Sequence, residues 1–306
     1  PPANYTLVIP DEIDGNLVVY IADNAFNSKT NFTSLTIGRN VKTIGSYAFT
    51  NCTAMTSISL PADGALETIN QCAFENCSNL VSIVLPNTVK TLGVNVLKSC
   101  TNLTSVTISN QLATIPNETF RNCTHLNNVV IPSSVTTINN NVFWDCDALT
   151  SITIPNSVTA LGTNVFRSCG ELSSVTFEEG CQLTTIPNEA FRECSSLTGI
   201  TIPLSITTIG SSAFNGSALT SITFPSNVTR INNSAFASCA NLTEVTIPST
   251  ITTVESYAFQ SCGLESANVY CHTIGAHMFY NCTELENITI SISRSEERFS
   301  RNAETD

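Results

Sequence analysis

The chain has 306 residues, of which 42% are hydrophobic and only 12% are charged, and its formal net charge is −12. The Lys and Arg residues are spaced singly, so they form no cluster that could neutralise phosphates, and we expect no nucleic-acid partner. No run of 18 apolar residues predicts a membrane-spanning segment, and the first residues lack the basic and apolar regions of a signal peptide.

One apolar pattern recurs twelve times between about residues 7 and 290. Its phase is marked by a Phe, replaced once by Leu, at Phe26, Phe49, Phe74, Leu97, Phe120, Phe143, Phe166, Phe191, Phe214, Phe236, Phe259 and Phe279. A period of about 23 residues predicts a solenoid, in which one coil cannot bury its own apolar face and stacking supplies the core. We therefore expect one elongated unit of about twelve coils over residues 1–290.

The coil at residues 149–171 shows the elements expected in each repeat. Alternation of apolar and polar residues predicts a first strand over residues 151–154, which Pro155 ends because it cannot donate to a ladder. Residues 158–161 predict a second short strand, and a short helical or 3-10 turn is expected to end at Cys169. The fold class is thus a mainly β repeat solenoid with short helical or 3-10 turns. The expected inward residues are Leu149, Ile152, Ile154, Val158, Leu161, Val165, Phe166 and Cys169.

Three segments depart from the regular repeat. Residues 61–65 and 178–182 carry two extra residues at the same point of the coil, between the two strands, so these loops should project from one edge of the rod. Residues 291–306 abandon the pattern and are interpreted as a C-terminal cap or linker.

Ten of the thirteen cysteines lie three residues after the marker position: Cys52, Cys77, Cys100, Cys123, Cys146, Cys169, Cys194, Cys239, Cys262 and Cys282. Side chains at one slot of stacked coils point the same way, which disfavours disulfide geometry between neighbours. We expect a column of buried free thiols that act as small hydrophobic side chains. Cys72, Cys181 and Cys271 lie off this column and have no evident mates, so the cysteines leave the redox compartment open.

The repeat resembles the BspA-like, Treponema-type leucine-rich repeat of about 23 residues. The resemblance rests on Leu149-Thr-Ser-Ile-Thr-Ile-Pro-Asn-Ser-Val158 and on Ile209-Gly-Ser-Ser-Ala-Phe214, and it extends to the opening stretch from Ile9 to Val18. It implies a curved, right-handed solenoid with a β-sheet along its concave face. It also implies a non-enzymatic protein of the extracellular space or cell surface that binds matrix proteins or other cells, with no catalytic residues and no cofactor.

Nothing in the sequence predicts catalysis or a metal centre. The histidines are His125, His272 and His277, and no nucleophile elbow of the Gly-x-Ser-x-Gly type is present. The spacing of Cys271, His272, His277 and Cys282 is not that of a zinc site and suits a degenerate terminal coil. We expect no enzyme, no cofactor and no metal.

Two features have a structural and a functional interpretation. Threonines recur in both strands, as an ice-binding face would require, although β-branched residues also suit exposed strands. Thirteen Asn-x-Ser/Thr sequons are candidate glycosylation sites, although several follow from the repeat itself. They begin at Asn4, Asn31, Asn51, Asn76, Asn102, Asn117, Asn122, Asn215, Asn227, Asn232, Asn241, Asn281 and Asn287.

Core positions are shared by every coil, so recognition must depend on outward residues that differ between coils. The candidate partner-binding residues are Val84, Asn127, Asn128, Val130, Gly199 and Glu244 on the first strands, and Trp144 in a turn. The leading hypothesis is an extracellular adhesion or protein-binding solenoid with a protein or glycan ligand. The alternative is a structural subunit of a filament or surface coat that self-assembles through solenoid ends or edges.

Overall fold

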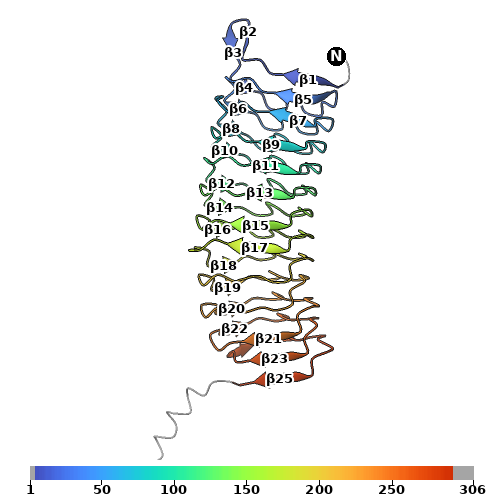
Figure 1. Ribbon diagram of the computed structural model, residues 1–306, viewed down its shortest axis with the longest axis vertical. Coiled ribbons are helices and arrows are strands. Elements are labelled where there is room, and N and C mark those ends of the chain that lie inside the picture. The colour runs from blue at the N-terminus through green and yellow to red at the C-terminus, as the bar shows by residue number, and fades with distance from the viewer. Residues whose placement is uncertain (1–3, 292–306) are drawn as a thin grey trace, which may run out of the picture.

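The computed structural model describes residues 4–291 and shows an elongated stack of coils (Figure 1). Two columns of short strands run along the stack, and no helix occurs within the described part of the chain. The expected β-solenoid is confirmed. Residues 292–306, which include most of the expected cap or linker, lie outside the described residues.

One column consists of the first strand of each coil. In β15, Ile152 and Ile154 point inward while Ser151 and Thr153 are exposed, which confirms the period-two alternation. Two coils contribute no strand, so the column has a gap between β17 and β21. Strand pairing also stops between β7 and β9 and between β13 and β15. The strands are β1 (Tyr5–Val8), β5 (Phe32–Thr36), β7 (Ser57–Ser59), β9 (Ser82–Val84), β11 (Ser105–Thr107), β13 (Asn128–Val130), β15 (Ser151–Ile154), β17 (Ser174–Phe177), β21 (Glu244–Ile247), β23 (Ser266–Val269) and β25 (Asn287–Ile290).

The other column holds two-residue strands, most of them a Thr followed by a buried aliphatic residue. They pair in parallel, so that Thr68 lies opposite Thr91 and Ile69 opposite Leu92. The second strand expected over residues 158–161 is shorter than expected, since only Ala160 and Leu161 pair. The strands are β4 (Tyr20–Ile21), β6 (Thr43–Ile44), β8 (Thr68–Ile69), β10 (Thr91–Leu92), β12 (Thr114–Ile115), β14 (Thr137–Ile138), β16 (Ala160–Leu161), β18 (Thr185–Ile186), β19 (Thr208–Ile209), β20 (Arg230–Ile231), β22 (Thr253–Val254) and β24 (Thr273–Ile274).

The third side of each coil, where a short helical or 3-10 turn was expected, is a run of hydrogen-bonded turns without a helix. The N–H groups of Ala48 and Thr50 bond three residues back, whereas the intervening N–H of Phe49 donates to the Ala73 carbonyl of the next coil at 2.8 Å. Left-handed backbone at Tyr47 and Asn51, with φ of 58° and 60°, produces this alternation. A continuous helix would bond every N–H within the coil, so the turns gain a third ladder of contacts between coils that a helix would forgo.

The core is one continuous apolar column. Seven of the eight expected inward residues of the coil at 149–171 are buried, and the exception, Leu161, is half-buried. The marker rings stack almost in parallel, with 5.4 Å between the centroids of Phe143 and Phe166. Leu97 interrupts the stack between Phe74 and Phe120.

All thirteen cysteines are free, and eleven of them are buried. Each of the ten column thiols donates to the marker carbonyl of the preceding coil. Cys146 Sγ, for example, lies 3.1 Å from the Phe120 carbonyl oxygen. The slot therefore requires a small side chain that is apolar enough for the core and still carries a donor.

The two ends of the rod differ. At the N-terminal end, an antiparallel hairpin of β2 (Glu12–Ile13) and β3 (Asn16–Leu17) projects beyond the stack (Figure 1). Asp14 and Gly15 form its turn with positive φ values of 50° and 75°. At the other end, every residue of β25 is exposed.

Candidate binding surfaces

The first-strand face brings two of the predicted residues into one row. Val84 on β9 and Val130 on β13 both lie opposite Thr107 on the intervening β11. These two residues are 60% and 74% exposed, on strands whose other outward side chains are mostly Ser and Thr. The register therefore builds a small apolar patch that spans three coils.

The other predicted residues of this face fall into two groups. Asn127 and Asn128 are exposed at the start of β13, next to the valine patch. Gly199 and Glu244 are exposed about three coils or more further along, at the interruption of the strand column. The predicted set is therefore not one continuous site.

The interruption creates three hollows in the first-strand face. Their volumes are about 470, 310 and 220 Å³, and they lie between β17 and β21. Glu244 lines the second hollow and Gly199 the third. Within the described chain, no backbone hydrogen bond joins residues 199–203 to β17 or residues 221–225 to β21. The coils remain stacked there through their other two sides.

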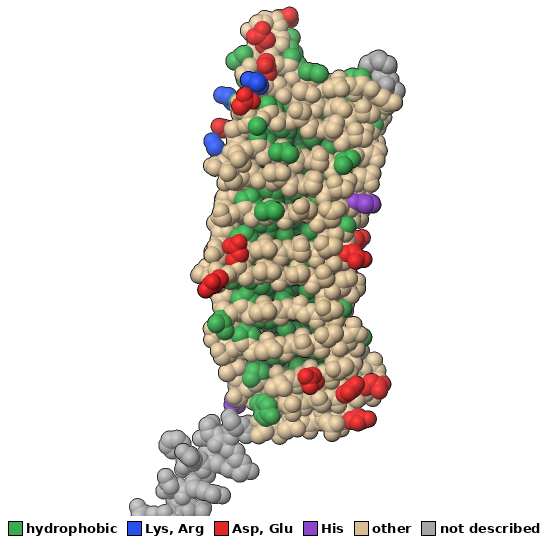
Figure 2. Space-filling view, in the orientation of Figure 1, with side chains coloured by type: hydrophobic (Ala, Val, Ile, Leu, Met, Phe, Trp, Pro, Cys, Tyr) green, Lys and Arg blue, Asp and Glu red, His purple; other side chains and the backbone are tan. Residues whose placement is uncertain are grey.

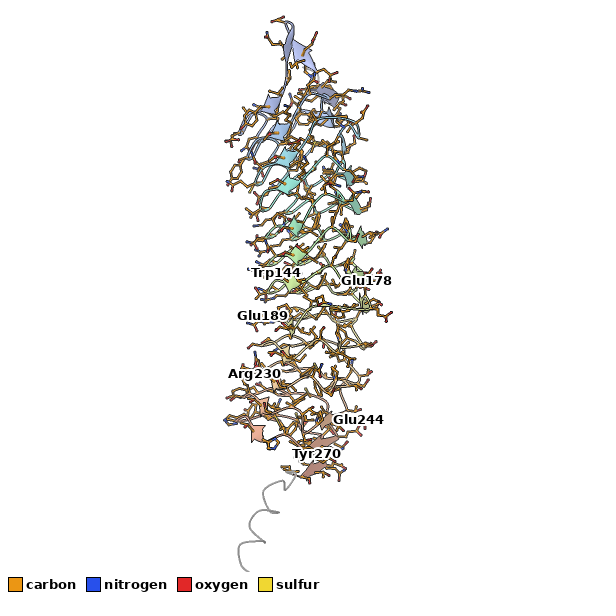
Figure 3. The ribbon with its side chains drawn as sticks, turned by 90° about the vertical axis from the view of Figure 1, so that its left-hand side faces the viewer. Trp144, Glu178, Glu189, Arg230, Glu244 and Tyr270 are labelled. Atoms are coloured by element: carbon orange, nitrogen blue, oxygen red, sulfur yellow. The ribbon has the colours of Figure 1, made fainter. Side chains whose placement is uncertain are left out.

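Trp144 lies on another side of the rod, away from Glu178 and Glu244 (Figure 3). Its ring is held between two guanidinium groups from neighbouring coils. The Arg121 Cζ atom lies 4.0 Å and the Arg167 Cζ atom 4.7 Å from the ring centroid. This geometry is that of a double cation–π contact, so the indole is partly covered and held in one orientation.

A column of cations surrounds this tryptophan, contrary to the expectation that the basic residues are scattered. Lys98 Nζ and Arg121 Nη1 lie 2.8 and 3.2 Å from Glu118 Oε2, and Arg167 Nη1 lies 2.7 Å from Glu189 Oε2. Burial alone would raise the pKa of Glu118, but Lys98 and Arg121 lower it overall. Every cation has a carboxylate partner, so the column is a polar, nearly neutral surface and not an anion site.

Alignment of the coils would have revealed this column. Its members all occupy the position one residue after the marker: Lys98, Arg121, Trp144, Arg167 and Arg192. Their distance along the sequence hides the proximity, because stacking places residues 23 apart side by side.

The sequons differ in accessibility. Asn51, Asn76 and Asn122 are half-buried at left-handed turn positions. Asn76 Nδ2 donates to Asn51 Oδ1 at 2.8 Å, and Asn122 Nδ2 donates to Ser99 Oγ at 3.2 Å. Asn117 and Asn241 are exposed in loops. A glycan on a half-buried amide would replace one of its two Nδ2 hydrogens and need space at a packed turn, whereas the exposed amides remain candidate sites.

The cysteines and histidines near the C-terminal end, which were considered as a metal site, form no such site in the fold. Cys271 is buried and Cys282 donates to the Phe259 carbonyl, while His277 stacks on Tyr257 with 5.2 Å between ring centroids. Among residues 4–291, no three His, Cys, Asp or Glu side chains form a group suited to a metal ion. No helix long and apolar enough to cross a membrane occurs in the same residues.

These features define a leucine-rich-repeat solenoid of the short, Phe-marked kind. The sequence model of the BspA type leucine rich repeat region, with 6 copies, matches residues 19–150, 113–239 and 207–301. The chain therefore belongs to this family. No curated protein matches the chain.

Solved structures of bacterial repeat proteins share the fold. A leucine rich cell surface protein of Faecalibacterium prausnitzii is 29% identical, with a TM-score of 0.61 over 97% of this chain and 90% of that chain. The pneumococcal vaccine antigen PcpA is 21% identical, with a TM-score of 0.60 over 94% and 72% of the two chains. A leucine-rich repeat protein of Eubacterium ventriosum is 22% identical, with a TM-score of 0.54 over 85% and 83%.

Proposed function

We propose that this chain is a non-enzymatic adhesion module of the extracellular space or cell surface, and that it binds a protein partner through its first-strand face. The observation that carries the proposal is the exposed row of Val84, Thr107 and Val130. Apolar side chains held on a rigid sheet suit the core of a protein interface, where water is excluded. The similar cell surface protein of Faecalibacterium prausnitzii supports the location.

A protein partner fits this face better than a glycan or a second copy of the chain. A glycan would bind better to the hydroxyl-rich strands that lack exposed valines. A glycan ligand therefore stays a prediction. The face carries few charged side chains, so we expect partner binding there to depend only mildly on salt.

The test replaces both valines by threonine, the residue already present between them. The V84T/V130T variant removes two methyl groups from the interface, about 1.6 kcal/mol in total, and should weaken binding about tenfold. Binding is measured by surface plasmon resonance on a panel of immobilised extracellular matrix proteins and by attachment to intact cells. Thermal stability should stay within a few degrees, because the replaced side chains are solvent-exposed.

The matched control is V94T, which changes an exposed valine outside the strands. It should leave binding unchanged. Failure to bind any panel member or cell would contradict the adhesion function. If V84T/V130T binds normally while W144A abolishes binding, the partner contacts the cation and tryptophan column instead of the first-strand face.

A further inference from the structure

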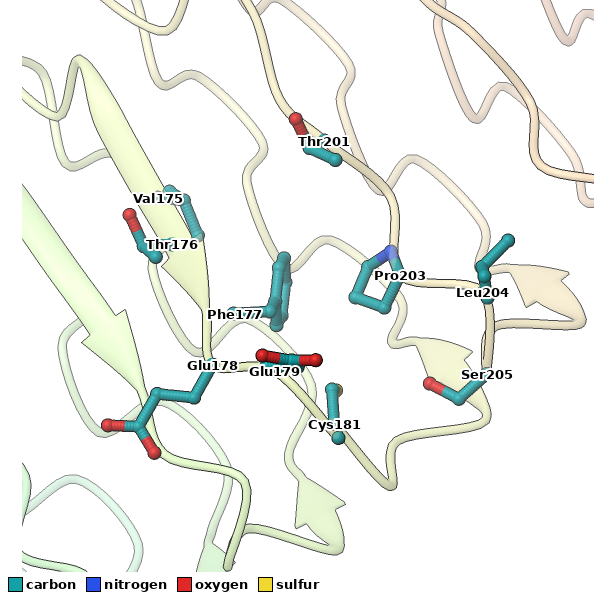
Figure 4. A pocket seen from close by; sticks show the side chains of 11 residues that line it. Val175, Thr176, Phe177, Glu178, Glu179, Cys181, Thr201, Pro203, Leu204 and Ser205 are labelled. Atoms are coloured by element: carbon teal, nitrogen blue, oxygen red, sulfur yellow. The ribbon is translucent and has the colours of Figure 1, made fainter.

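The largest of the three hollows in the first-strand face lies beside the inserted loop at residues 178–182 (Figure 4). Its volume of about 470 Å³ is within the range of small-ligand sites. Phe177 from the end of β17 and Pro203 from the next coil form opposing apolar walls, and the partly exposed thiol of Cys181 lies between the loop and that coil. The hollow thus forms where a longer loop meets a coil that has no first strand.

Leu204 adds an apolar rim that the repeat does not require. Its side chain is 69% exposed, and it follows the strand-ending proline in a turn. Five other coils with this proline place Asn or Ser at that position: Asn87, Ser133, Asn156, Ser226 and Ser249. The first inserted loop has Ala62 there. An exposed leucine at a turn position that takes Asn or Ser in those five coils contributes nothing to the core. Together with Phe177 and Pro203 it makes the lining of the hollow more apolar than one exposed side chain would.

The hollow also carries negative charge without a cation. Glu178 accepts a hydrogen bond from the Asn156 backbone N–H at 3.1 Å, and neither Glu178 nor Glu179 forms an ion pair within the described residues. The equivalent loop at residues 61–65 differs, because Asp63 there lies 3.3 Å from Arg39. Only the second loop therefore offers an unpaired carboxylate to a partner.

Polar groups at the hollow lack partners as well. Ser205 Oγ is buried without a hydrogen bond, whereas the corresponding Ser134 and Ser157 hydroxyls each donate to a carbonyl of the preceding coil at 2.8 Å. Thr88, which holds the same slot after the first inserted loop, also has a buried hydroxyl without a hydrogen bond, so this feature accompanies both insertions. In addition, β17 pairs only with β15, so its backbone edge toward the hollow is free among the described strands. Unpaired buried polar groups are costly unless a ligand satisfies them.

We propose that this hollow binds an extended peptide segment of a protein partner, with an aliphatic side chain in the apolar hollow and an adjacent Lys or Arg at Glu179. The assignment deepens the proposed function, on which it rests, by adding a second contact and naming its chemistry. Phe177, Pro203 and Leu204 bury the aliphatic group, and Glu179 attracts the cation. The Ser205 hydroxyl and the free edge of β17 supply hydrogen bonds to the peptide backbone.

The test uses three capped hexapeptides that differ only in their central pair: Leu-Lys, Leu-Glu and Ser-Lys. We expect the Leu-Lys peptide to bind the full chain about fivefold more tightly than the Leu-Glu peptide, because charge reversal removes an exposed ion pair. It should bind about tenfold more tightly than the Ser-Lys peptide, because serine cannot fill the apolar hollow. Affinity is measured by isothermal titration calorimetry. Added salt should lower the affinity of the Leu-Lys peptide.

A second readout locates the bound peptide. The thiols of Cys181 and Cys282 are the partly exposed ones among the thirteen. The Leu-Lys peptide should slow alkylation of Cys181 by iodoacetamide and leave the alkylation rate of Cys282 unchanged. Mass spectrometry measures both rates. Equal alkylation of Cys181 with and without peptide would overturn the assignment.

Variants separate the hollow from the rest of the rod. L204N introduces the residue type found in other coils, so it should fold normally and weaken binding of the Leu-Lys peptide several-fold. E179Q should weaken binding of this peptide to a similar extent. D63N in the first inserted loop is the matched control and should change nothing. Loss of peptide binding with intact binding to matrix proteins would refute this site alone. Peptide binding without any matrix or cell partner would refute the adhesion function and leave the site standing.

Discussion

At the scale of single residues, the column cysteines show how one slot constrains side-chain chemistry. Burial raises the pKa of the Cys52 thiol to about 11 and that of the Cys100 thiol to about 12. Each thiol is thus held neutral, in the form that can donate to the preceding coil. Ser217 occupies the same slot in one coil and is buried, so a hydroxyl is tolerated there.

These pKa values predict a loss of stability in mild alkali. A thiol whose pKa is raised in the folded state contributes its full stability below the unfolded pKa of about 9, and this contribution is lost as the pH rises toward 12. Between pH 9 and 11, the unfolded chain releases thiol protons that the fold retains. Each deeply buried thiol should then lower the free energy of unfolding by about 1.4 kcal/mol per pH unit.

The measurement is a series of chemical unfolding curves at pH 8, 9 and 10. A variant with C100S, C123S, C146S and C169S carries hydroxyls in four column slots and should show a flatter dependence on pH, even if it is less stable at pH 8. Equal slopes in the variant and the parent chain would show that the thiols do not cause the alkaline loss.

At the scale of one coil, the marker ring contacts the rings above and below it. The stacked centroids lie 5.1–5.5 Å apart in the regular part of the rod, with interplanar angles between 3° and 17°. Leu97 breaks this stack, yet it is fully buried between the coils of Phe74 and Phe120. The coil therefore forgoes two aromatic contacts that its neighbours have in place.

Replacing Leu97 by Phe should stabilise the chain. Overpacking a core costs about 1–3 kcal/mol where no space exists, but this slot accepts Phe in every other coil. The two new ring contacts should contribute about 0.5–1.5 kcal/mol each, so the thermal midpoint of L97F should rise. F143L, which copies the natural exception, should lower it, and F143A should cost about 3–5 kcal/mol. A midpoint for L97F below that of the parent would mean that this coil is narrower than the others.

The sequence predicted the coil because its signals act locally or repeat. The period of the marker Phe, the alternation of Ile152 with Ser151 and the stop at Pro155 need no knowledge of distant residues. The expected helical or 3-10 turn is a run of separate turns, because apolar spacing cannot show that Tyr47 and Asn51 adopt left-handed backbone. The cation column and the Leu204 hollow depend on contacts between coils, which appear only when the repeats are aligned by slot.

At the scale of the whole molecule, charge opposes assembly through the ends. Asp11, Glu12 and Asp14 lie in or beside the N-terminal hairpin, and acidic side chains also gather at the opposite end of the face in Figure 2. Glu265, Glu284 and Glu286 belong to that last part of the described chain. Bringing two such ends together places like charges next to each other, which costs energy at low ionic strength.

We therefore expect the chain to sediment as a monomer at neutral pH and low salt, contrary to the filament or coat alternative. Analytical ultracentrifugation at increasing protein concentration measures this directly. The variant E12Q/D14N/E284Q/E286Q tests the cause, because any end-to-end association should strengthen when these charges are removed. Filaments formed by the unmodified chain at low salt would favour the structural-subunit hypothesis instead.

The left-handed turn positions also govern how such a rod can change over generations. Each coil holds two of them, two residues before and two residues after the marker, and none is a β-branched residue. The residue between the marker and the second of these positions varies from coil to coil, and Arg121, Trp144 and Arg167 meet there. Because both left-handed positions of a turn come from the same coil, a duplicated coil can form its turn without changes elsewhere in the chain. Rod length and surface chemistry can therefore diverge independently, one by copying whole coils and the other by single substitutions.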